Sequence, residues 1–270
     1  MSAQSWTAGE GPELHYEVER RALGKYAEKF VPLAADAGTQ AWLAEVAARP
    51  HSMVETWLVS QLTRFMSAYD AHGLTATYAM HLLSEAQWGS LTGGARRALL
   101  DVGAGAGYVT EHAKPWFQHI TCTETSRPLA KRLGERGFRV HAHDLLEVPL
   151  PEHGPFDVIS CLNVLDRTRR PISLLAALRA MLAPGARLVL ALPLPVRPHV
   201  HVAGATVSPQ ERLPISEDSF KLSLVEMSAF LEEQGFDIER IARVPYLSRG
   251  DSKAPYYVLD DALWVLSKRD

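Results

Sequence analysis

The residues best suited to chemistry lie in the run LLDVGAGAGYVT, residues 99–110. Its first half is apolar, predicts a short buried strand, and carries one acid, Asp101. Gly103, Gly105 and Gly107 follow at once, and the next residues have the spacing of a helix. Glycines between a strand and a helix N-terminus leave backbone N–H groups bare against a ligand, because no Cβ stands in the way. The run therefore predicts a ligand-binding turn.

The details of the turn indicate which ligand it takes. A dinucleotide fingerprint needs Gly or Ala at the sixth position, where Tyr108 stands, and the Gly-Lys-Ser/Thr end of a P-loop is absent. An acid two residues before Gly-x-Gly-x-Gly resembles the S-adenosylmethionine loop of class I methyltransferases. The next predicted strand ends in Glu124, where this fold places an acid for both ribose hydroxyls. A carboxylate suits that task because it accepts two hydrogen bonds. A glycine-rich turn of another α/β protein is the alternative.

Composition sets outer limits on the class of protein. The 270 residues are 47% hydrophobic and 22% charged, which is typical of a globular enzyme. A net charge of −3 without a Lys/Arg run argues against a nucleic-acid partner. Cys122 and Cys161 lie in apolar runs and are expected to be core residues. No apolar leader or membrane-length segment is evident, so we expect a cytoplasmic protein with no membrane partner. The oligomeric state is not predicted.

Residues 1–94 are expected to form an N-terminal helical lobe. Apolar residues recur at helical spacing over 13–30, 39–48 and 53–69. The last segment carries a stripe that includes Trp57 and Phe65. Since such stripes usually face a core, we expect this one to pack on the rest of the protein.

Residues 95–270 are expected to form a class I S-adenosylmethionine-dependent methyltransferase domain. Its pattern alternates strands and helices, which predicts a doubly wound, mostly parallel seven-stranded sheet. No helix separates the last two strands, so the last strand should be antiparallel. The predicted strands are 97–102, 119–124, 138–142, 156–161, 186–192, 236–244 and 256–266, and the predicted helices are 107–117, 126–136, 171–182 and 218–234.

Ligands of such sheets lie over the carboxyl ends of the strands. Asp144 follows the third strand, where it would meet the adenine amino group. Asn163 and Asp166 follow the fourth strand in the run DVISCLNVLDR, and a helical turn would aim both the same way. The alternative is that Asn163 caps the turn and Asp166 pairs with Arg167 or Arg169.

Five blocks in order make the chain resemble the DREV family, the protein-histidine N-pros-methyltransferases that act on His-x-His motifs. The resemblance covers most of the chain after residue 95 and, more weakly, the helical N-terminal lobe. It implies S-adenosylmethionine as cofactor and proteins or peptides with His-x-His motifs as substrates. The blocks are LLDVGAGAGYVT, DVISCLNVLDR with Pro171, RLVLALPLPVRPHV, RVPYLSRGD and YYVLDDALWVL.

Site roles follow from the resemblance, together with the motifs above. The candidate cofactor residues are Asp101, Gly103, Gly105, Gly107, Glu124, Asp144 and Asn163. The candidate catalytic residues are Asp166 and Asn163, facing the target imidazole, with Tyr246 and Tyr257 closing the substrate site. The chain departs from the family pattern at Ala106, Asp144 and His199, and the last of these concerns peptide contacts.

Histidine pairs allow two other hypotheses. His141 and His143, and likewise His199 and His201, have the spacing that turns two imidazoles of a strand to one face. No further ligand completes a tetrahedral metal site nearby, so no metal is expected. Both pairs are themselves His-x-His sequences and therefore candidates for automethylation. Two other functions stay open: methylation of a small imidazole compound such as a histidine dipeptide, and a non-catalytic S-adenosylmethionine-binding module.

Overall fold

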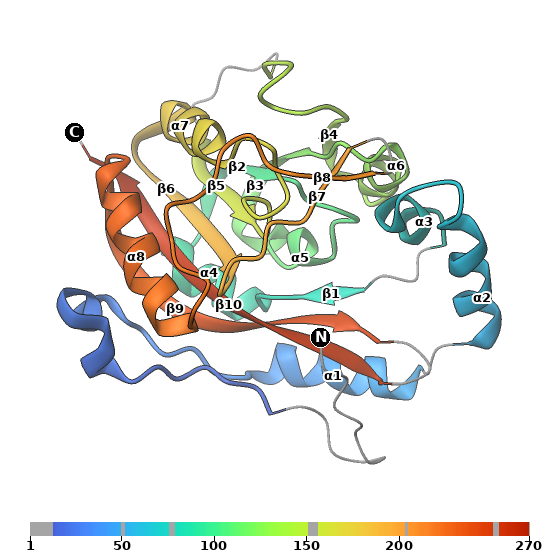
Figure 1. Ribbon diagram of the computed structural model, residues 1–270, viewed down its shortest axis with the longest axis horizontal. Coiled ribbons are helices and arrows are strands. Elements are labelled where there is room, and N and C mark those ends of the chain that lie inside the picture. The colour runs from blue at the N-terminus through green and yellow to red at the C-terminus, as the bar shows by residue number, and fades with distance from the viewer. Residues whose placement is uncertain are drawn as a thin grey trace.

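The computed structural model describes residues 13–49, 52–75, 79–150, 156–202, 205–250 and 254–269. An eight-stranded sheet runs through it in the order β1-β9-β10-β6-β5-β2-β3-β4 (Figure 1). The strands β2 to β6 pair in parallel, whereas β10 is antiparallel to both of its neighbours. The bounds are β1 Met80–His81, β2 Arg96–Val102, β3 Phe117–Thr123, β4 Arg139–His141, β5 Phe156–Leu162, β6 Leu182–Pro193, β9 Phe236–Arg249 and β10 Tyr256–Lys268. The predicted doubly wound α/β fold with an antiparallel last strand is confirmed.

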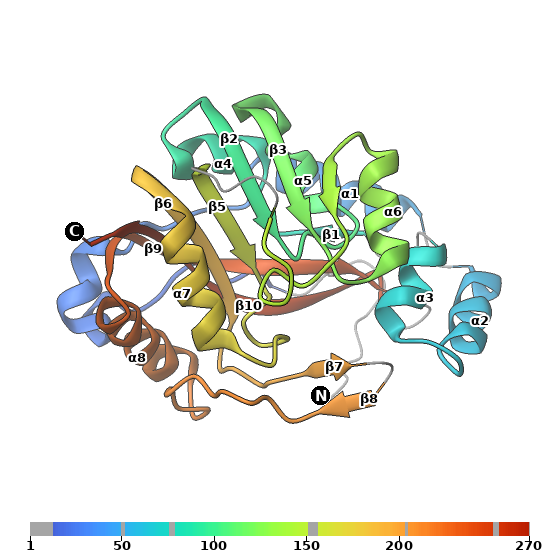
Figure 2. The same cartoon turned by 90° about the horizontal axis from the view of Figure 1, so that it is seen from above.

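Helices cover both faces of the sheet (Figure 2). Side chains alternate across β6, so Leu188 and Leu190 join one core with α7 and α8, while Val189 and Ala191 join another with α4. Cys122 and Cys161 are buried core residues, as predicted. The helices are η1 Arg20–Lys29, α1 Ala37–Ala48, α2 Met53–Leu62, α3 Ala68–Thr75, α4 Glu85–Thr92, α5 Tyr108–Glu111, η2 Lys114–Trp116, α6 Arg127–Glu135, α7 Pro171–Met181 and α8 Phe220–Glu233, and a separate hairpin joins β7 Val200–Val202 to β8 Ala205–Val207.

Three of the helices expected from the sequence are interrupted in the structure. The segment 13–30 has no regular secondary structure up to Glu19 and then forms the 3-10 helix η1, which kinks at Gly24 with φ 53°. The predicted helix 107–117 splits into α5 and η2, whose middle residue is Pro115 and so has no N–H to donate. The segment 53–69 likewise divides into α2 and α3.

The apolar stripe of α2 is not core, and this prediction is wrong. Trp57 is 62% exposed and Phe65, just beyond the helix, is 86% exposed. In Figure 1 this helix stands at the edge of the molecule, beyond the end of the sheet. Helical spacing predicts that a helix is amphipathic, but it does not show whether another element covers the apolar side.

The N-terminal part of the chain also contributes to the sheet. In β1, Met80 pairs with Ser248 and His81 with Leu247, both on β9. Phe30 forms a further isolated bridge with Ile241. A two-residue strand is too short to show an alternating apolar pattern in the sequence. This explains why seven strands were expected and eight are present in this sheet. The division into units 1–94 and 95–270 stays a prediction.

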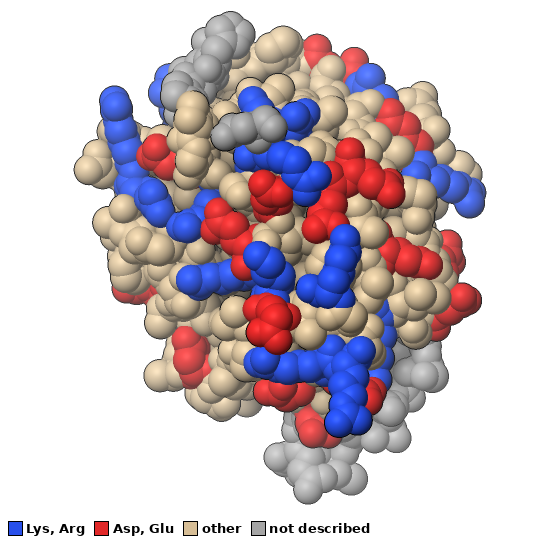
Figure 3. Space-filling model, turned by 90° about the vertical axis from the view of Figure 1, so that its left-hand side faces the viewer, with Lys and Arg blue, Asp and Glu red and all other residues tan. Residues whose placement is uncertain are grey.

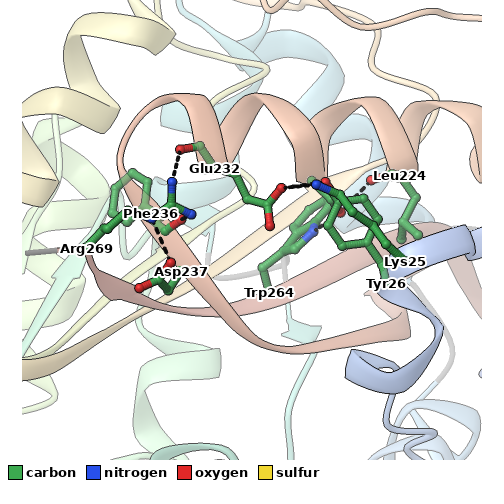
Figure 4. A network of polar contacts seen from close by, with 9 residues as sticks. Lys25, Tyr26, Leu224, Glu232, Phe236, Asp237, Trp264 and Arg269 are labelled. Carbon is green, nitrogen blue, oxygen red and sulfur yellow. Dashed lines mark hydrogen bonds and ion pairs between the residues drawn. The ribbon is translucent and has the colours of Figure 1, made fainter.

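Polar contacts fasten η1 to α8 (Figure 4). The Glu232 carboxylate accepts hydrogen bonds from Lys25 Nζ at 2.6 Å and from the Tyr26 hydroxyl at 2.9 Å. Behind them, Trp264 Nε1 donates to Ser228 Oγ at 2.9 Å. Lys25 is largely exposed, so its ion pair contributes little, and the buried Tyr26 ring supplies most of the attachment.

The face drawn in Figure 3 shows acidic and basic side chains interleaved over the surface, without a large area of one sign. This mixed pattern is not that of a nucleic-acid groove on this face. Over the described residues, no helix has the length and apolarity that crossing a membrane requires.

Candidate functional site

A cavity of about 900 Å³ opens at the carboxyl ends of β2, β3 and β5. Its size is that of pockets for small molecules and cofactors. Among the candidate site residues it is lined by Gly103, Gly105, Glu124, Asp144, Asn163 and Tyr246, and not by Asp101, Gly107, Asp166 and Tyr257.

Gly103 and Gly105 both have a left-handed backbone, which favours glycine, and Gly103 also has no room for a side chain. Gly103 has φ 70°, and a Cβ there would lie 2.6 Å from Val164 Cγ2, so no side chain fits. Gly105 has φ 60°, and a Cβ there would meet only the Met80 methyl at 3.8 Å. The Gly103 N–H donates to the Thr123 carbonyl at 3.0 Å, which fixes the loop against β3. Both glycines line the cavity, and Gly105 is the one with open space where a side chain would stand.

Glu124 joins the glycine loop to the start of α6. Its Oε2 accepts from the Gly105 N–H at 2.9 Å and its Oε1 from the Ser126 N–H at 2.8 Å. Burial raises the pKa of this carboxyl, while the backbone N–H groups lower it. The carboxylate thus stands in the cavity wall, held by two donors.

Asp101 and Gly107 lie behind the loop. The Asp101 carboxylate accepts from Thr110 Oγ1 at 2.5 Å and from Ser160 Oγ at 2.7 Å, and burial raises its pKa to about 6. It therefore ties β2 to α5 and β5 and does not reach the cavity. A Cβ on Gly107, with φ 80°, would lie 2.7 Å from Leu133 Cδ2, so this glycine permits close packing against α6. The structure does not bring these two predicted cofactor residues to the cavity.

Asn163 is the polar residue that β5 presents to the cavity. It has φ 59°, a left-handed conformation that Asn adopts more readily than most residues. Its N–H donates to the Ala191 carbonyl at 3.0 Å. Neither its Nδ2 nor its Oδ1 has a hydrogen-bond partner of normal geometry within the described residues, although both are buried. An unpaired buried amide is costly, so the site is suited to a ligand that pairs with it.

Asp166 adjoins the cavity without lining it. Its Oδ2 lies 3.5 Å from Arg167 Nε, which is the ion pair that the alternative interpretation predicted. Its Oδ1 is buried without a partner among the described residues, and burial raises the pKa of the carboxyl. Its carbonyl accepts from the His199 N–H at 2.7 Å. Its ion-pair partner Arg167 and its hydrogen-bond partner His199 both line the cavity, so Asp166 lies directly behind the cavity wall.

The two candidate tyrosines differ. Tyr246 is buried in the cavity wall, and its hydroxyl contacts Met80 Sδ. Tyr257 is 45% exposed and pairs in register with Ser248, away from the cavity wall. The structure brings the first to the site and not the second.

Sequence reasoning missed the cavity wall that the N-terminal part supplies. Ser126, at the start of α6, donates to Asp70 Oδ1 on α3 at 2.5 Å, and Arg132 Nε donates to the Gly73 carbonyl at 2.8 Å. These contacts hold α3 over the site, where Phe65, Met66, Asp70 and His72 line the cavity. No motif joins these segments in the sequence, so nothing there could have found them.

The histidine pairs provide no metal site in the described part of the chain, where no three His, Cys, Asp or Glu side chains cluster as ligands. His141 and His143 have ring centroids 5.6 Å apart, and the second ring lines the cavity. His199 lines it too, whereas the side chain of His201 lies outside the described residues. Automethylation stays a prediction.

Comparison with known proteins decides the family. The DREV methyltransferase family matches residues 15–268. This chain is a DREV-family methyltransferase. S-adenosylmethionine is the cofactor of this methyltransferase family.

Solved structures share the fold at low identity. The [4+2]-cyclase SpnF is 16% identical with a TM-score of 0.50, covering 82% of this chain and 98% of that one. The 1,6-didemethyltoxoflavin-N1-methyltransferase of Burkholderia thailandensis is 18% identical with a TM-score of 0.47, covering 89% and 93%. The N-methyltransferase NodS of Bradyrhizobium japonicum is 18% identical with a TM-score of 0.46, covering 69% and 86%. A cyclase with this fold shows that the fold alone does not fix the reaction.

The residues at the cavity fit the family's cofactor. The bare backbone at Gly105 allows close approach of a ligand, and the unpaired Asn163 amide offers it a donor and an acceptor. Glu124 stands at the end of the neighbouring strand with a buried carboxylate.

Replacing Gly103 with Ala is expected to destabilise the protein by about 2 kcal/mol or more. The left-handed backbone costs an L-residue about 1–2 kcal/mol, and crowding against Val164 adds about 1–3 kcal/mol. Urea unfolding checks this. The control is Gly134→Ala in α6, where a Cβ meets nothing within 4 Å and helix propensity should add up to about 1 kcal/mol. A Gly103→Ala variant as stable as the parent protein would contradict the loop geometry.

Proposed function

We propose that this methyltransferase acts on histidine, adding a methyl group to the pros nitrogen, Nδ1, in His-x-His motifs of proteins. The observation that carries this proposal is the unpaired polar atoms of Asn163 and Asp166 beside the cavity that Gly105 and Glu124 border. These two side chains suit a methyl acceptor that donates a hydrogen bond from one nitrogen and keeps a free lone pair on another. The neutral imidazole has both, one on each ring nitrogen. The resemblance of the sequence to protein-histidine N-pros-methyltransferases supports the same acceptor.

Asp166 supplies the chemistry that imidazole requires. Its Oδ1 would accept from the Nε2–H of the target ring, which fixes the tautomer with the lone pair on Nδ1. The lone pair on Nδ1 would then receive the methyl group, and the cofactor would leave with the electron pair of the broken carbon–sulfur bond. The ring becomes positively charged, and the carboxylate stabilises that charge and takes the Nε2 proton. The product is neutral methylhistidine.

The remaining residues bind and orient. In S-adenosylmethionine, the ribose hydroxyls would bind to Glu124 and the methionine part to the loop at Gly105. The adenine amino group would bind to Asp144. S-adenosylmethionine, when bound, supplies an electrophilic methyl group. Asn163 and Tyr246 would position the target ring, which contributes orientation and not proton transfer.

A small imidazole compound is the second candidate substrate. The cavity, at about 900 Å³, is large enough to enclose both a cofactor and a compound the size of a histidine dipeptide. Competition separates the two, since a small-molecule enzyme would bind the free dipeptide in preference to a peptide.

The test uses radiolabelled S-adenosylmethionine and three matched acceptors. We expect label on a peptide with His-Ala-His, at a rate about tenfold or more above a peptide in which one His is Gln, because the second imidazole adds binding contacts. A histidine dipeptide in excess should not compete. Equal labelling of both peptides would contradict the motif, and strong competition by the dipeptide would favour the second candidate.

A further inference from the structure

The apolar face of α2 is open to solvent and has no part in the mechanism above. Val54, Trp57 and Leu58 form this face, since residues three and four positions apart lie on the same side of a helix. Their exposed fractions lie between 42% and 71%. Single exposed apolar side chains are common, whereas a contiguous group of them marks a surface that binds another molecule.

The same face continues past the end of α2 to the cavity. Phe65 follows Leu58 by seven positions, which is about two helical turns along the same side. The chain keeps winding over this stretch, because the N–H groups of Phe65 and Met66 donate to the Leu62 carbonyl at 3.0 Å and 3.1 Å. Phe65 and Met66 both line the cavity. The exposed apolar face of α2 therefore leads directly to the site.

Contacts on the other side of α2 hold this face outward. Glu55 Oε2 lies 3.6 Å from Arg249 Nη2 of β9, and the same guanidinium donates to the Arg49 carbonyl at 3.1 Å. Val59 and Leu62, which lie on the side of Glu55, are half-buried. The helix thus turns its polar and half-buried side to the protein, and the exposure of the apolar face follows from how it is attached.

The charges and length of this segment indicate the kind of partner. Between Met53 and Met66 only Glu55 and Arg64 are charged. Helices that lie on a membrane surface are rich in Lys and Arg, so this segment lacks their pattern. An apolar polypeptide segment needs no such charges. The ten residues of α2 span about 15 Å, which an extended chain covers with about five residues.

We propose that the apolar face of α2, together with Phe65, binds an apolar segment of the protein substrate within about ten residues of the methylated side chain. The cavity would receive the acceptor side chain while the segment lies along the helix. Such a surface favours a polypeptide substrate, because a free dipeptide is too short to reach it. This inference rests on the proposed function only in that the substrate is a polypeptide.

The kinetic test compares peptides that differ only in an apolar block. Leu-Phe-Leu-Leu is placed about five residues before or after His-Ala-His, and serines stand at the same places in the control peptides. For the parent protein, KM should be about tenfold lower with one of the two apolar peptides than with its control, and kcat should not change. Equal KM values for all of the peptides would overturn the proposal.

The matched variants are Trp57→Ser and Leu222→Ser. Trp57 is the largest side chain of the face, and its loss should reduce the advantage of the apolar peptide to about twofold or less. Leu222 is an exposed leucine of α8, at the opposite side of the molecule from α2 (Figure 1), and its variant should keep the full advantage. An advantage that survives in Trp57→Ser would also overturn the proposal.

A binding measurement separates this surface from the histidine assignment. In a fluorescent apolar peptide with both histidines replaced by Gln, anisotropy reports docking alone. The peptide should bind Trp57→Ser about tenfold more weakly than the parent protein. If this difference is found and no histidine peptide is methylated, the docking surface stands and the proposed acceptor fails. If histidine is methylated and the difference is absent, the acceptor stands and the docking surface fails.

Two further measurements address other occupants of the face. Sedimentation without peptide should give the same molar mass for the parent protein and Trp57→Ser. Flotation with vesicles of phosphatidylcholine and phosphatidylserine should leave the parent protein unbound. A dimer that Trp57→Ser disrupts would assign the face to a second copy of the chain, and vesicle binding that Trp57→Ser removes would assign it to a membrane. Either result would overturn the proposal.

Discussion

Replacing Asp166 with Asn is expected to lower the rate of methyl transfer by about 100-fold or more. The amide keeps the size of the side chain but loses the charge that matches an imidazolium and the basicity that takes its proton. Cofactor affinity should stay near that of the parent protein, because Asp166 does not line the cavity wall. Single-turnover labelling measures the rate, and calorimetry with S-adenosylhomocysteine measures the affinity.

The matched control for this variant is Asp237→Asn. Asp237 is a half-exposed acid at the start of β9, 2.8 Å from Arg269 Nε (Figure 4), and it does not line the cavity, so its loss should leave the rate unchanged. If the Asp166→Asn variant transferred methyl groups at the parent rate, Asp166 would have only a structural role as the ion-pair partner of Arg167.

Replacing Glu124 with Ala should weaken cofactor binding by about 2–3 kcal/mol, or roughly 30- to 150-fold. The variant removes a buried, charged acceptor and also frees the N–H groups of Gly105 and Ser126, which the carboxylate now holds. Glu124→Gln keeps one acceptor and the side-chain shape, so its loss should be smaller. Calorimetry on both variants checks this order. Unchanged affinity in Glu124→Ala would remove Glu124 from the cofactor site.

Local sequence order was enough to predict the centre of the site. An apolar strand followed by glycines fixes a strand, a turn and a helix start, so Gly103, Gly105 and Glu124 lie near their expected places. The antiparallel end of the sheet followed from the missing helix between its last two strands. Such features depend on residues that are neighbours in the chain, and the sequence shows them directly.

Features that depend on packing were not predictable. Asp101 was expected to contact the cofactor, but Thr110 and Ser160 occupy both its oxygens, and only the folded chain brings them together. Whether a side chain at a strand end faces the cavity or the core depends on the neighbouring strands. For the same reason, Tyr257 was expected at the site and the apolar stripe of α2 in the core, whereas the structure places neither there.

The isomer of the product tests the histidine mechanism most directly. If Asp166 holds the Nε2–H of the target ring, only Nδ1 has a lone pair, and a flipped ring would lose that hydrogen bond. A His-Ala-His peptide should therefore yield pros-methylhistidine after methylation and acid hydrolysis, as amino-acid analysis against both standards would show. Mostly tele-methylhistidine, or label on lysine or arginine, would contradict both the carboxylate geometry and the proposed acceptor.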